Sequence, residues 1–256
     1  MQWENFFGII YILVGIYGLL IGSFLNVCIY RLPKGEGIVK GRSHCMSCKE
    51  SIAWYDLIPV VSWLCLGGRC RKCHTKISYQ YPLMEAANGL LYVIIFHKYG
   101  VTVTAFLYAL TASALLVLSI IDWRTFEIPD LLSGTILLLG SIRVLTDLRH
   151  FKLYIIGFFS VSIVLLLLYI FTNGRAIGGG DVKLMAAIGL LLGWKQTLFA
   201  FIAGCILGSF IHSFRIKVFK VGNQLAFGPY LAAGSFLSML YGEEIIGWYM
   251  HTFLYI

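Results

Sequence analysis

The stretch Gly178-Gly179-Gly180-Asp181-Val182-Lys183 lies between two long apolar runs, at residues 152–172 and 182–214. A carboxylate at the edge of a hydrocarbon layer is costly, so Asp181 is a candidate functional residue. Each glycine is about 1 kcal/mol less favourable than Ala in a helix, so a helix is predicted to begin near Asp181. Glycine backbone there, as at Gly178 and Gly180, would let water and an extended peptide approach the acid. The alternative is an ordinary acidic helix start that follows a flexible loop.

The composition identifies the class of protein. Of the 256 residues, 59% are hydrophobic and 12% are charged, and the mean hydropathy is +0.83. These values are typical of a polytopic membrane protein. A net charge of +8 could indicate a nucleic-acid partner, but the basic residues lie at the ends of the apolar segments. That placement favours a lipid bilayer as the partner and argues against nucleic acid.

Eight apolar segments are predicted to span the membrane, which gives an all-α polytopic fold. They cover residues 6–30, 82–96, 101–121, 129–145, 153–171, 182–192, 197–214 and 228–241. The second and sixth are short for a hydrocarbon layer of about 30 Å. Gly18 and Gly22 form a small-xxx-small face that predicts close packing of the first span against another helix. Most Lys and Arg residues fall on one side of these spans, so the N-terminus is predicted to lie outside.

A second acid follows the third predicted span. In this topology Asp122 and Asp181 both lie at the cytoplasmic surface of the membrane. Negative charge is unfavourable at a helix C-terminus, so helix capping does not explain Asp122, although a solvated helix end remains the alternative. Two carboxylates on one side can share a proton: the ionised one activates water while the protonated one polarises a scissile carbonyl. Lys183, close to Asp181, would support the ionised form. The sequence therefore predicts Asp122 and Asp181 as a catalytic pair.

The polar block after the first span carries two CxxC motifs, Cys45-Met46-Ser47-Cys48 and Cys70-Arg71-Lys72-Cys73. Residues 49–69 separate them, a spacer close to the roughly 15–20 residues usual for paired zinc knuckles. Four thiolates complete a tetrahedral structural zinc site, and a block this small needs such support. Free thiols or disulfides are the alternatives, and disulfides are disfavoured in a reducing cytosol. Cys28, Cys65 and Cys205 lack such neighbours and are interpreted as packing residues.

With these motifs the chain resembles the bacterial type IV prepilin peptidases, which are bifunctional leader peptidases and N-methyltransferases. The resemblance covers nearly the whole chain and rests on several motifs in order. They are Gly22-Ser23-Phe24-Leu25-Asn26-Val27 with Tyr30-Arg31-Leu32-Pro33, the two CxxC pairs, Pro82-Leu83-Met84-Glu85, Asp122 with Ile128-Pro129-Asp130, Gly178-Gly179-Gly180-Asp181, and Phe227-Gly228-Pro229-Tyr230.

The resemblance implies a GxGD aspartyl protease in the bacterial cytoplasmic (inner) membrane, with its active site facing the cytoplasm. It implies that Asp122 and Asp181 cut the leader from a prepilin or pseudopilin, just before the substrate's hydrophobic helix. It also implies methylation of the new N-terminus by S-adenosylmethionine, for which the spacing of residues reveals no binding site. The implied organisation is a first transmembrane helix at 1–30, a cytoplasmic zinc-binding domain at 31–81 associated with methyl transfer, and a peptidase bundle at 82–256.

Three other functions remain as alternatives. A proton-coupled transporter also uses membrane carboxylates, but it normally places them near the midplane at the interface of internal repeats, and the sequence contains no repeat. A zinc-knuckle scaffold would need the cysteines and not the two acids. A different GxGD intramembrane protease is the nearest enzyme alternative, and the cysteine block argues against it.

Overall fold

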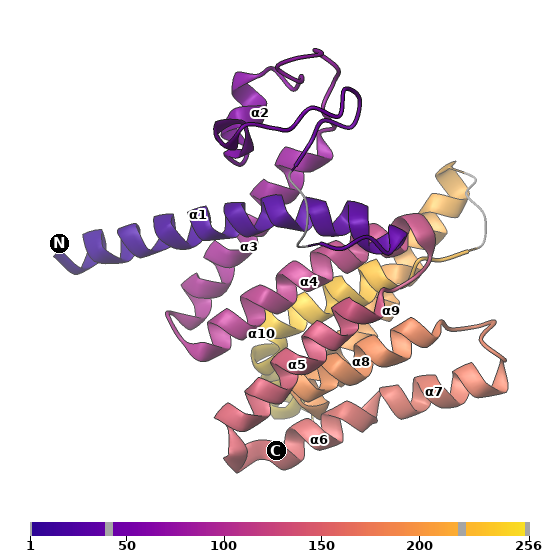
Figure 1. Ribbon diagram of the computed structural model, residues 1–256. Coiled ribbons are helices and arrows are strands. Elements are labelled where there is room, and N and C mark those ends of the chain that lie inside the picture. Colours follow the sequence, from indigo (N-terminus) through magenta and orange to yellow (C-terminus); the bar gives the residue numbers. More distant parts are fainter. Residues whose placement is uncertain (1, 39–42, 220–223, 254–256) are drawn as a thin grey trace. The chain divides into compact units, whose positions relative to one another are not determined.

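The computed structural model describes residues 2–38, 43–219 and 224–253, which are mainly helical and contain no extended strand (Figure 1). The chain forms two units, Met1–Ala109 and Leu110–Ile256, and each is described by itself. The helix α4 (Val103–Thr125) begins in the first unit and continues into the second. The predicted all-α membrane class is confirmed.

The first unit is built on α1 (Gln2–Arg31), which packs along α3 (Gln80–Tyr99). A Cβ atom at Gly18 would lie 2.8 Å from the Cα of Gly89, and one at Gly22 would lie 2.7 Å from the Cα of Glu85. Only glycine allows the two backbones to approach this closely, so the predicted small-xxx-small contact is confirmed. The buried Asn88 side chain donates a hydrogen bond to the carbonyl of Gly18 at 2.7 Å, which adds a polar tie between the two helices.

The polar block between α1 and α3 has little regular structure. It contains the short helices η1 (Leu32–Lys34), η2 (Trp54–Leu57) and α2 (Val61–Cys65). The Trp63 indole donates a hydrogen bond to the carbonyl of Ile77 at 3.3 Å, and its ring contacts that of Tyr79. These contacts tie α2 to the segment that leads into α3.

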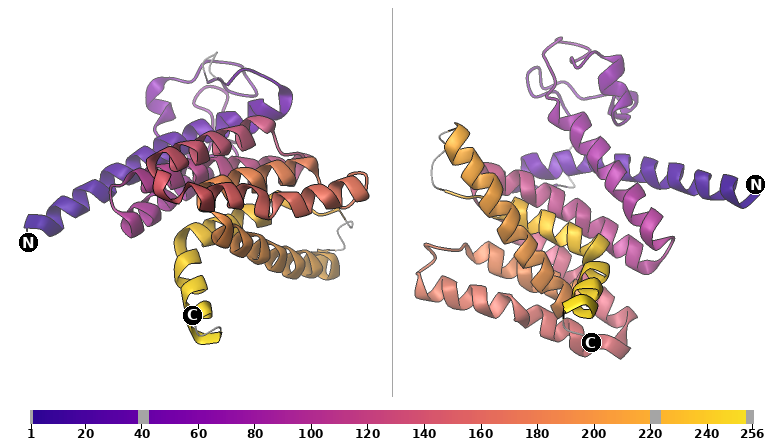
Figure 2. Two further views of the ribbon diagram at one scale, coloured as in Figure 1. Left: turned by 90° about the horizontal axis from the view of Figure 1, so that it is seen from below. Right: turned by 180° about the vertical axis from the view of Figure 1, so that it is seen from behind.

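The second unit is organised around α8 (Gly179–Leu192), whose residues from Leu184 onward are all buried. The other helices are α5 (Asp130–Thr146), η3 (Leu148–His150), α6 (Phe151–Ser160), α7 (Ser162–Phe171), α9 (Trp194–Phe219) and α10 (Gly228–Phe253). Helices α5, α6, α7 and α9 pack against α8, while α9 and α10 pack against each other (Figure 2). A helix that is apolar on all sides is buried in this way.

Each predicted span coincides with helix, with two corrections. The segment 153–171 is not one helix, because α6 and α7 are separated at Val161. The helix α8 begins at Gly179 and not at Asp181, so two glycines enter its first turn. Among the described residues, four segments are long and apolar enough to cross a bilayer: Gly8–Lys34, Val103–Thr125, Leu148–Phe171 and Trp194–Val218. The count of eight spans stays a prediction.

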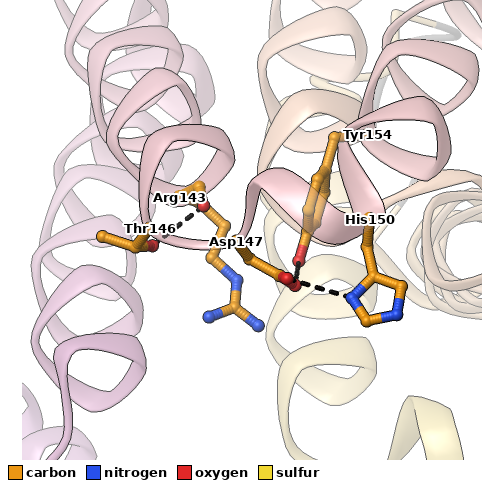
Figure 3. A network of polar contacts seen from close by, with 5 residues as sticks. All are labelled: Arg143, Thr146, Asp147, His150 and Tyr154. Carbon is orange, nitrogen blue, oxygen red and sulfur yellow. Dashed lines mark hydrogen bonds and ion pairs between the residues drawn. The ribbon is translucent and has the colours of Figure 1, made fainter.

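The turn between α5 and α6 is held by a polar network around Asp147 (Figure 3). The Tyr154 hydroxyl donates to one carboxylate oxygen at 2.8 Å, and the His150 ring contacts the other at 2.9 Å. The hydrogen bond with His150, followed by that from Tyr154, lowers the pKa of Asp147 below its usual value. The ionised carboxylate is therefore the form that stabilises this turn.

This network predicts a pH-dependent contribution to stability. An aspartate with a lowered pKa stabilises the fold above its unfolded pKa of about 3.9, and the contribution is lost as the pH falls through the lower folded value. We expect Asp147→Asn to lower Tm by about 2–4 °C at neutral pH, as for a loss of roughly 1 kcal/mol in a chain of this size. Thermal unfolding in detergent should show this difference shrinking below about pH 4. A constant difference from pH 7 to pH 3 would contradict it.

Candidate active site and cysteine cluster

Asp181 lies in the first turn of α8 and is 8% exposed. Its carboxylate accepts a hydrogen bond from the N–H of Gly178, the residue that precedes the helix, at 3.3 Å. The helix N-terminus favours negative charge at this position, and the hydrogen bond satisfies one otherwise unpaired amide. A Cβ atom at Gly180 would lie 2.8 Å from the Cβ of Ile128, so glycine lets the start of α8 approach the segment before α5.

Asp122 lies in the last turn of α4 and is 5% exposed. Its carboxylate accepts a hydrogen bond at 2.8 Å from the N–H of Gly228, which is the first residue of α10. A Cβ atom at Gly228 would lie 2.8 Å from the same carboxylate oxygen, so glycine leaves room for it. The N-terminus of α10 thus offsets the unfavourable position of Asp122 at the C-terminal end of its own helix.

The two buried acids lie near each other in the second unit. Asp181 interacts electrostatically with Asp122, although the two residues lie on different helices. Each carboxylate also accepts a hydrogen bond from a backbone N–H at the start of a helix. The donor is Gly178 for Asp181 and Gly228 for Asp122. Neighbouring carboxylates that cannot both ionise freely share a proton, and such a pair provides an acid and a base for the same reaction.

Two charged side chains near this site, those of Lys183 and Arg215, contact residues other than the two acids. The Lys183 ammonium pairs with Asp130 at 2.6 Å, which links α8 to the start of α5, and both side chains are exposed. The Arg215 guanidinium lies over the Trp123 ring at 4.1 Å, so α9 contacts the residue next to Asp122. The structure places Lys183 against Asp130, and its predicted support of an ionised Asp181 stays a prediction.

The four predicted cysteine ligands lie together. The Sγ atoms of Cys45, Cys48, Cys70 and Cys73 are all within 4.8 Å of one another, and those of Cys45 and Cys73 are 3.7 Å apart. Four sulfurs at about 2.3 Å from a tetrahedral zinc ion would be about 3.8 Å apart, so the donor set and its size fit zinc. All four are free thiols, as are Cys28, Cys65 and Cys205.

Two similar turns present the thiols. In each turn the residue after the second cysteine donates a backbone hydrogen bond to the carbonyl of the first cysteine. The N–H of Lys49 donates to Cys45 at 2.9 Å, and the N–H of His74 donates to Cys70 at 3.0 Å. Lys49 and His74 both adopt positive φ, at 59° and 55°. Hydrogen bonds from the side chain and the backbone of Thr75 lower the pKa of Cys73 to about 6. Cys73 therefore favours the thiolate, which is the form that binds metal.

Glu85 is buried at 6% exposure and joins the polar block to α3. Its carboxylate accepts a hydrogen bond from the N–H of Val60 at 2.7 Å and interacts with Ser23. Val60 has φ 60° and ψ −51°, the strained region of a γ-turn, which is unusual for a β-branched residue. Glu85 lies one turn into the second predicted span, where the sequence leaves two readings: a partner for the substrate amine or a basic loop, or an interfacial acid paired with Lys or Arg. No sequence signal identified its partner as a backbone amide.

The fold and these two sites define a class: a multi-helix membrane protein with a buried pair of carboxylates and a cysteine cluster. Comparison with known families agrees with this description. Residues 16–99 match the Bacterial Peptidase A24 N-terminal domain, and residues 109–213 match the Type IV leader peptidase family. No solved structure matches the chain.

Similar curated proteins cover almost the whole chain. The "Prepilin leader peptidase/N-methyltransferase" of Bacillus subtilis is 30% identical over 92% of this chain and 96% of its own length. The protein of the same name from Pseudomonas aeruginosa is 32% identical over 91% of this chain and 91% of its own length. The one from Aeromonas hydrophila is 33% identical over 94% of this chain and 94% of its own length. The chain belongs to the type IV leader peptidase family.

Proposed function

We propose that this protein is a membrane aspartic endopeptidase that removes the leader peptide of prepilins or pseudopilins and then methylates the new N-terminus. The observation that carries the peptidase reaction is the pair Asp122 and Asp181. Both are buried, and each accepts a hydrogen bond from a backbone N–H at the start of a helix. They also interact electrostatically. The relatives named above are prepilin leader peptidases and N-methyltransferases, which supports this choice of substrate and of second activity.

In the proposed reaction the two acids hold one proton between them. The ionised carboxylate takes a proton from water, and the resulting hydroxide attacks the carbonyl carbon of the scissile peptide bond. The protonated carboxylate donates to the carbonyl oxygen, and a proton then passes to the leaving amine as the C–N bond breaks. The Gly178 and Gly228 amides hold the two carboxylates in place. Because the pair shares its proton, its two pKa values belong to the pair and not to either residue.

The proposed orientation follows from the distribution of basic residues. Most Lys and Arg residues lie on the side that carries the polar block and the two acids, and this side is predicted to face the cytoplasm. A substrate whose hydrophobic helix remains in the bilayer would then present its leader to the site without leaving the membrane. The active site therefore faces the cytoplasm in this proposal, and the N-terminus lies outside.

The cysteine cluster is proposed to hold zinc as a structural ion. Cys45, Cys48, Cys70 and Cys73 would be its ligands, and the ion would fix the fold of the 31–81 domain. S-adenosylmethionine is the proposed methyl donor, which supplies a transferable methyl group when it is bound. No residue is assigned to it. The first helix at 1–30 and the peptidase bundle at 82–256 complete the proposed organisation.

The proposal is tested by incubating the purified protein with a prepilin and labelled S-adenosylmethionine. We expect the prepilin to become shorter by its leader and the new N-terminus to gain one label. Cleavage and methyl incorporation are measured separately, by mass and by radioactivity. A protein that leaves the prepilin intact but carries protons into liposomes in its absence would instead be a transporter.

A further inference from the structure

Glu85 is a buried acid that the proposed peptidase reaction does not use. Among the described residues three acids are buried, and the other two are the proposed catalytic pair. Glu85 lies in the second turn of α3 and belongs to the first unit, which also carries the cysteine cluster. A buried acid near the start of an apolar helix is costly, so it is a candidate functional residue. The first unit therefore contains an acid that is available for a second reaction.

The Glu85 carboxylate can accept more hydrogen bonds than it receives. Its partners in the described part of the chain are the N–H of Val60 at 2.7 Å and the side chain of Ser23 on α1. No ion pair joins it to a Lys or Arg of the described ranges. An ionised carboxylate offers about four acceptor sites, so two donors leave about half of them unfilled. An ammonium group, which carries three N–H donors and a positive charge, would match what is missing.

A second acceptor lies one helical turn away from this carboxylate. Asn26 is 4% exposed, and its side-chain oxygen is buried with no hydrogen-bond partner within the described ranges. Its NH2 group donates to the carbonyl of Tyr81 at 3.2 Å, and Tyr81 precedes Glu85 by four residues on α3. Asn26 also follows Ser23 by three residues, so the two lie on the same face of α1. These side chains form a group of acceptors with too few donors, which favours a cationic amine as the ligand.

A strained turn occupies one oxygen of the Glu85 carboxylate. Val60 has φ 60° and ψ −51°, and the N–H of Val61 donates to the carbonyl of Pro59 at 2.5 Å. This is the rare and strained form of the γ-turn. Strained backbone persists where the surrounding contacts hold it, and it is concentrated at functional sites. The hydrogen bond to Glu85 is one such contact, so a ligand that replaces the Val60 N–H would let the turn relax and open.

We propose that Glu85 binds the primary amine of the new N-terminus and acts as the base for its methylation. This inference rests on the proposed function and assigns a residue to its second reaction. The amine replaces the Val60 N–H at the carboxylate, and the Asn26 oxygen accepts another of its hydrogen bonds. Glu85 then takes one proton from the ammonium group, which frees the lone pair of the nitrogen. The nitrogen attacks the methyl carbon of S-adenosylmethionine, and the C–N bond forms as the C–S bond breaks to leave a neutral thioether.

Binding of mature pilin without any methyl donor tests the amine site directly. Two forms of one leader-free pilin are compared in detergent, with a free and with an acetylated N-terminus. The wild type should bind the free amine about tenfold more tightly, because acetylation removes the charge and two of three donors. Glu85→Gln should bind both forms alike, and Glu36→Gln, an exposed acid of the same unit, should behave as the wild type. Equal affinity of the wild type for the two forms would overturn the proposal.

The pH dependence of methylation separates a base from a structural residue. Gln keeps an oxygen that can accept the Val60 N–H, so Glu85→Gln should retain its zinc and its cleavage of prepilin. Its methylation rate at pH 7 should fall by about 10²-fold or more. This rate should then rise about tenfold per pH unit toward the pKa of the amine, which is about 8, because a neutral amine needs no base.

Two results would contradict this role of Glu85. They are wild-type methylation by Glu85→Gln, and a loss of rate in this variant that a higher pH does not restore. If the wild type cuts prepilin but never methylates the mature pilin, the proposed second activity is wrong. The comparison of free and acetylated pilin then still decides whether Glu85 binds the amine.

Discussion

Asp181→Asn is expected to reduce prepilin cleavage by at least about 10³-fold, and Asp122→Asn by a similar factor. General acid–base catalysis contributes roughly 10²–10⁴-fold, and either change leaves the pair without a shared proton. An amide retains the size of the carboxylate, so the packing around the helix starts should persist. Initial rates with a purified prepilin, measured in detergent, give the result. Retention of more than a tenth of the wild-type rate in a folded Asp181→Asn protein would exclude the proposed pair.

Glu127→Gln is the matched control for these two variants. It makes the same carboxylate-to-amide change five residues after Asp122, on an exposed side chain. Surface substitutions of this kind usually change stability by less than about 0.5 kcal/mol, so activity should remain within about twofold. The wild type should also show a bell-shaped dependence of kcat/KM on pH, because one acid must be ionised and the other protonated. The same curve in both amide variants would exclude a catalytic role for the pair.

Cys45→Ser should remove the metal from the polar block and unfold that block while cleavage is retained. Wild-type protein is expected to contain about one zinc ion per chain. Binding of structural zinc contributes about 10–16 kcal/mol in small domains, far more than a block of this size can replace by packing. Metal analysis and limited proteolysis of the 43–81 region measure both effects. Methylation should be lost together with the fold of this block.

Cys65→Ser is the control within the same block. Cys65 is exposed on α2 and is not one of the four clustered cysteines, so its replacement should leave zinc content and protease resistance unchanged. Full zinc content in Cys45→Ser would exclude the four-cysteine site. Loss of cleavage together with zinc would show that the peptidase bundle also depends on the block.

Much of the fold was predictable because apolar length and basic flanks determine where membrane helices lie. The four cysteines were also predictable, because two CxxC motifs at this spacing are typical of a four-cysteine metal site. It also identified Asp122 and Asp181 from their positions in the chain, without any knowledge of their contacts. Their catalytic roles stay a prediction.

The contacts between distant elements were not predictable. The N–H of Gly228 reaches the Asp122 carboxylate across more than a hundred residues, and local sequence carries no signal of that pairing beyond the motif that contains Gly228. The separation of α6 from α7 at Val161 was missed because the segment is mainly apolar and only Ser160 and Ser162, which flank the break, interrupt it. The buried contact between Glu85 and Val60 depends on tertiary packing in the same way.

The similar turns at Lys49 and His74 have a practical consequence for handling the protein. Cys45 and Cys73 come from different turns, and their sulfurs are only 3.7 Å apart. If the ion is stripped in air, oxidation can join these two sulfurs and leave too few thiolates to rebind metal. Loss of the proposed zinc ion would then not be reversed by adding metal alone, so a reducing agent should be present before any chelator is added.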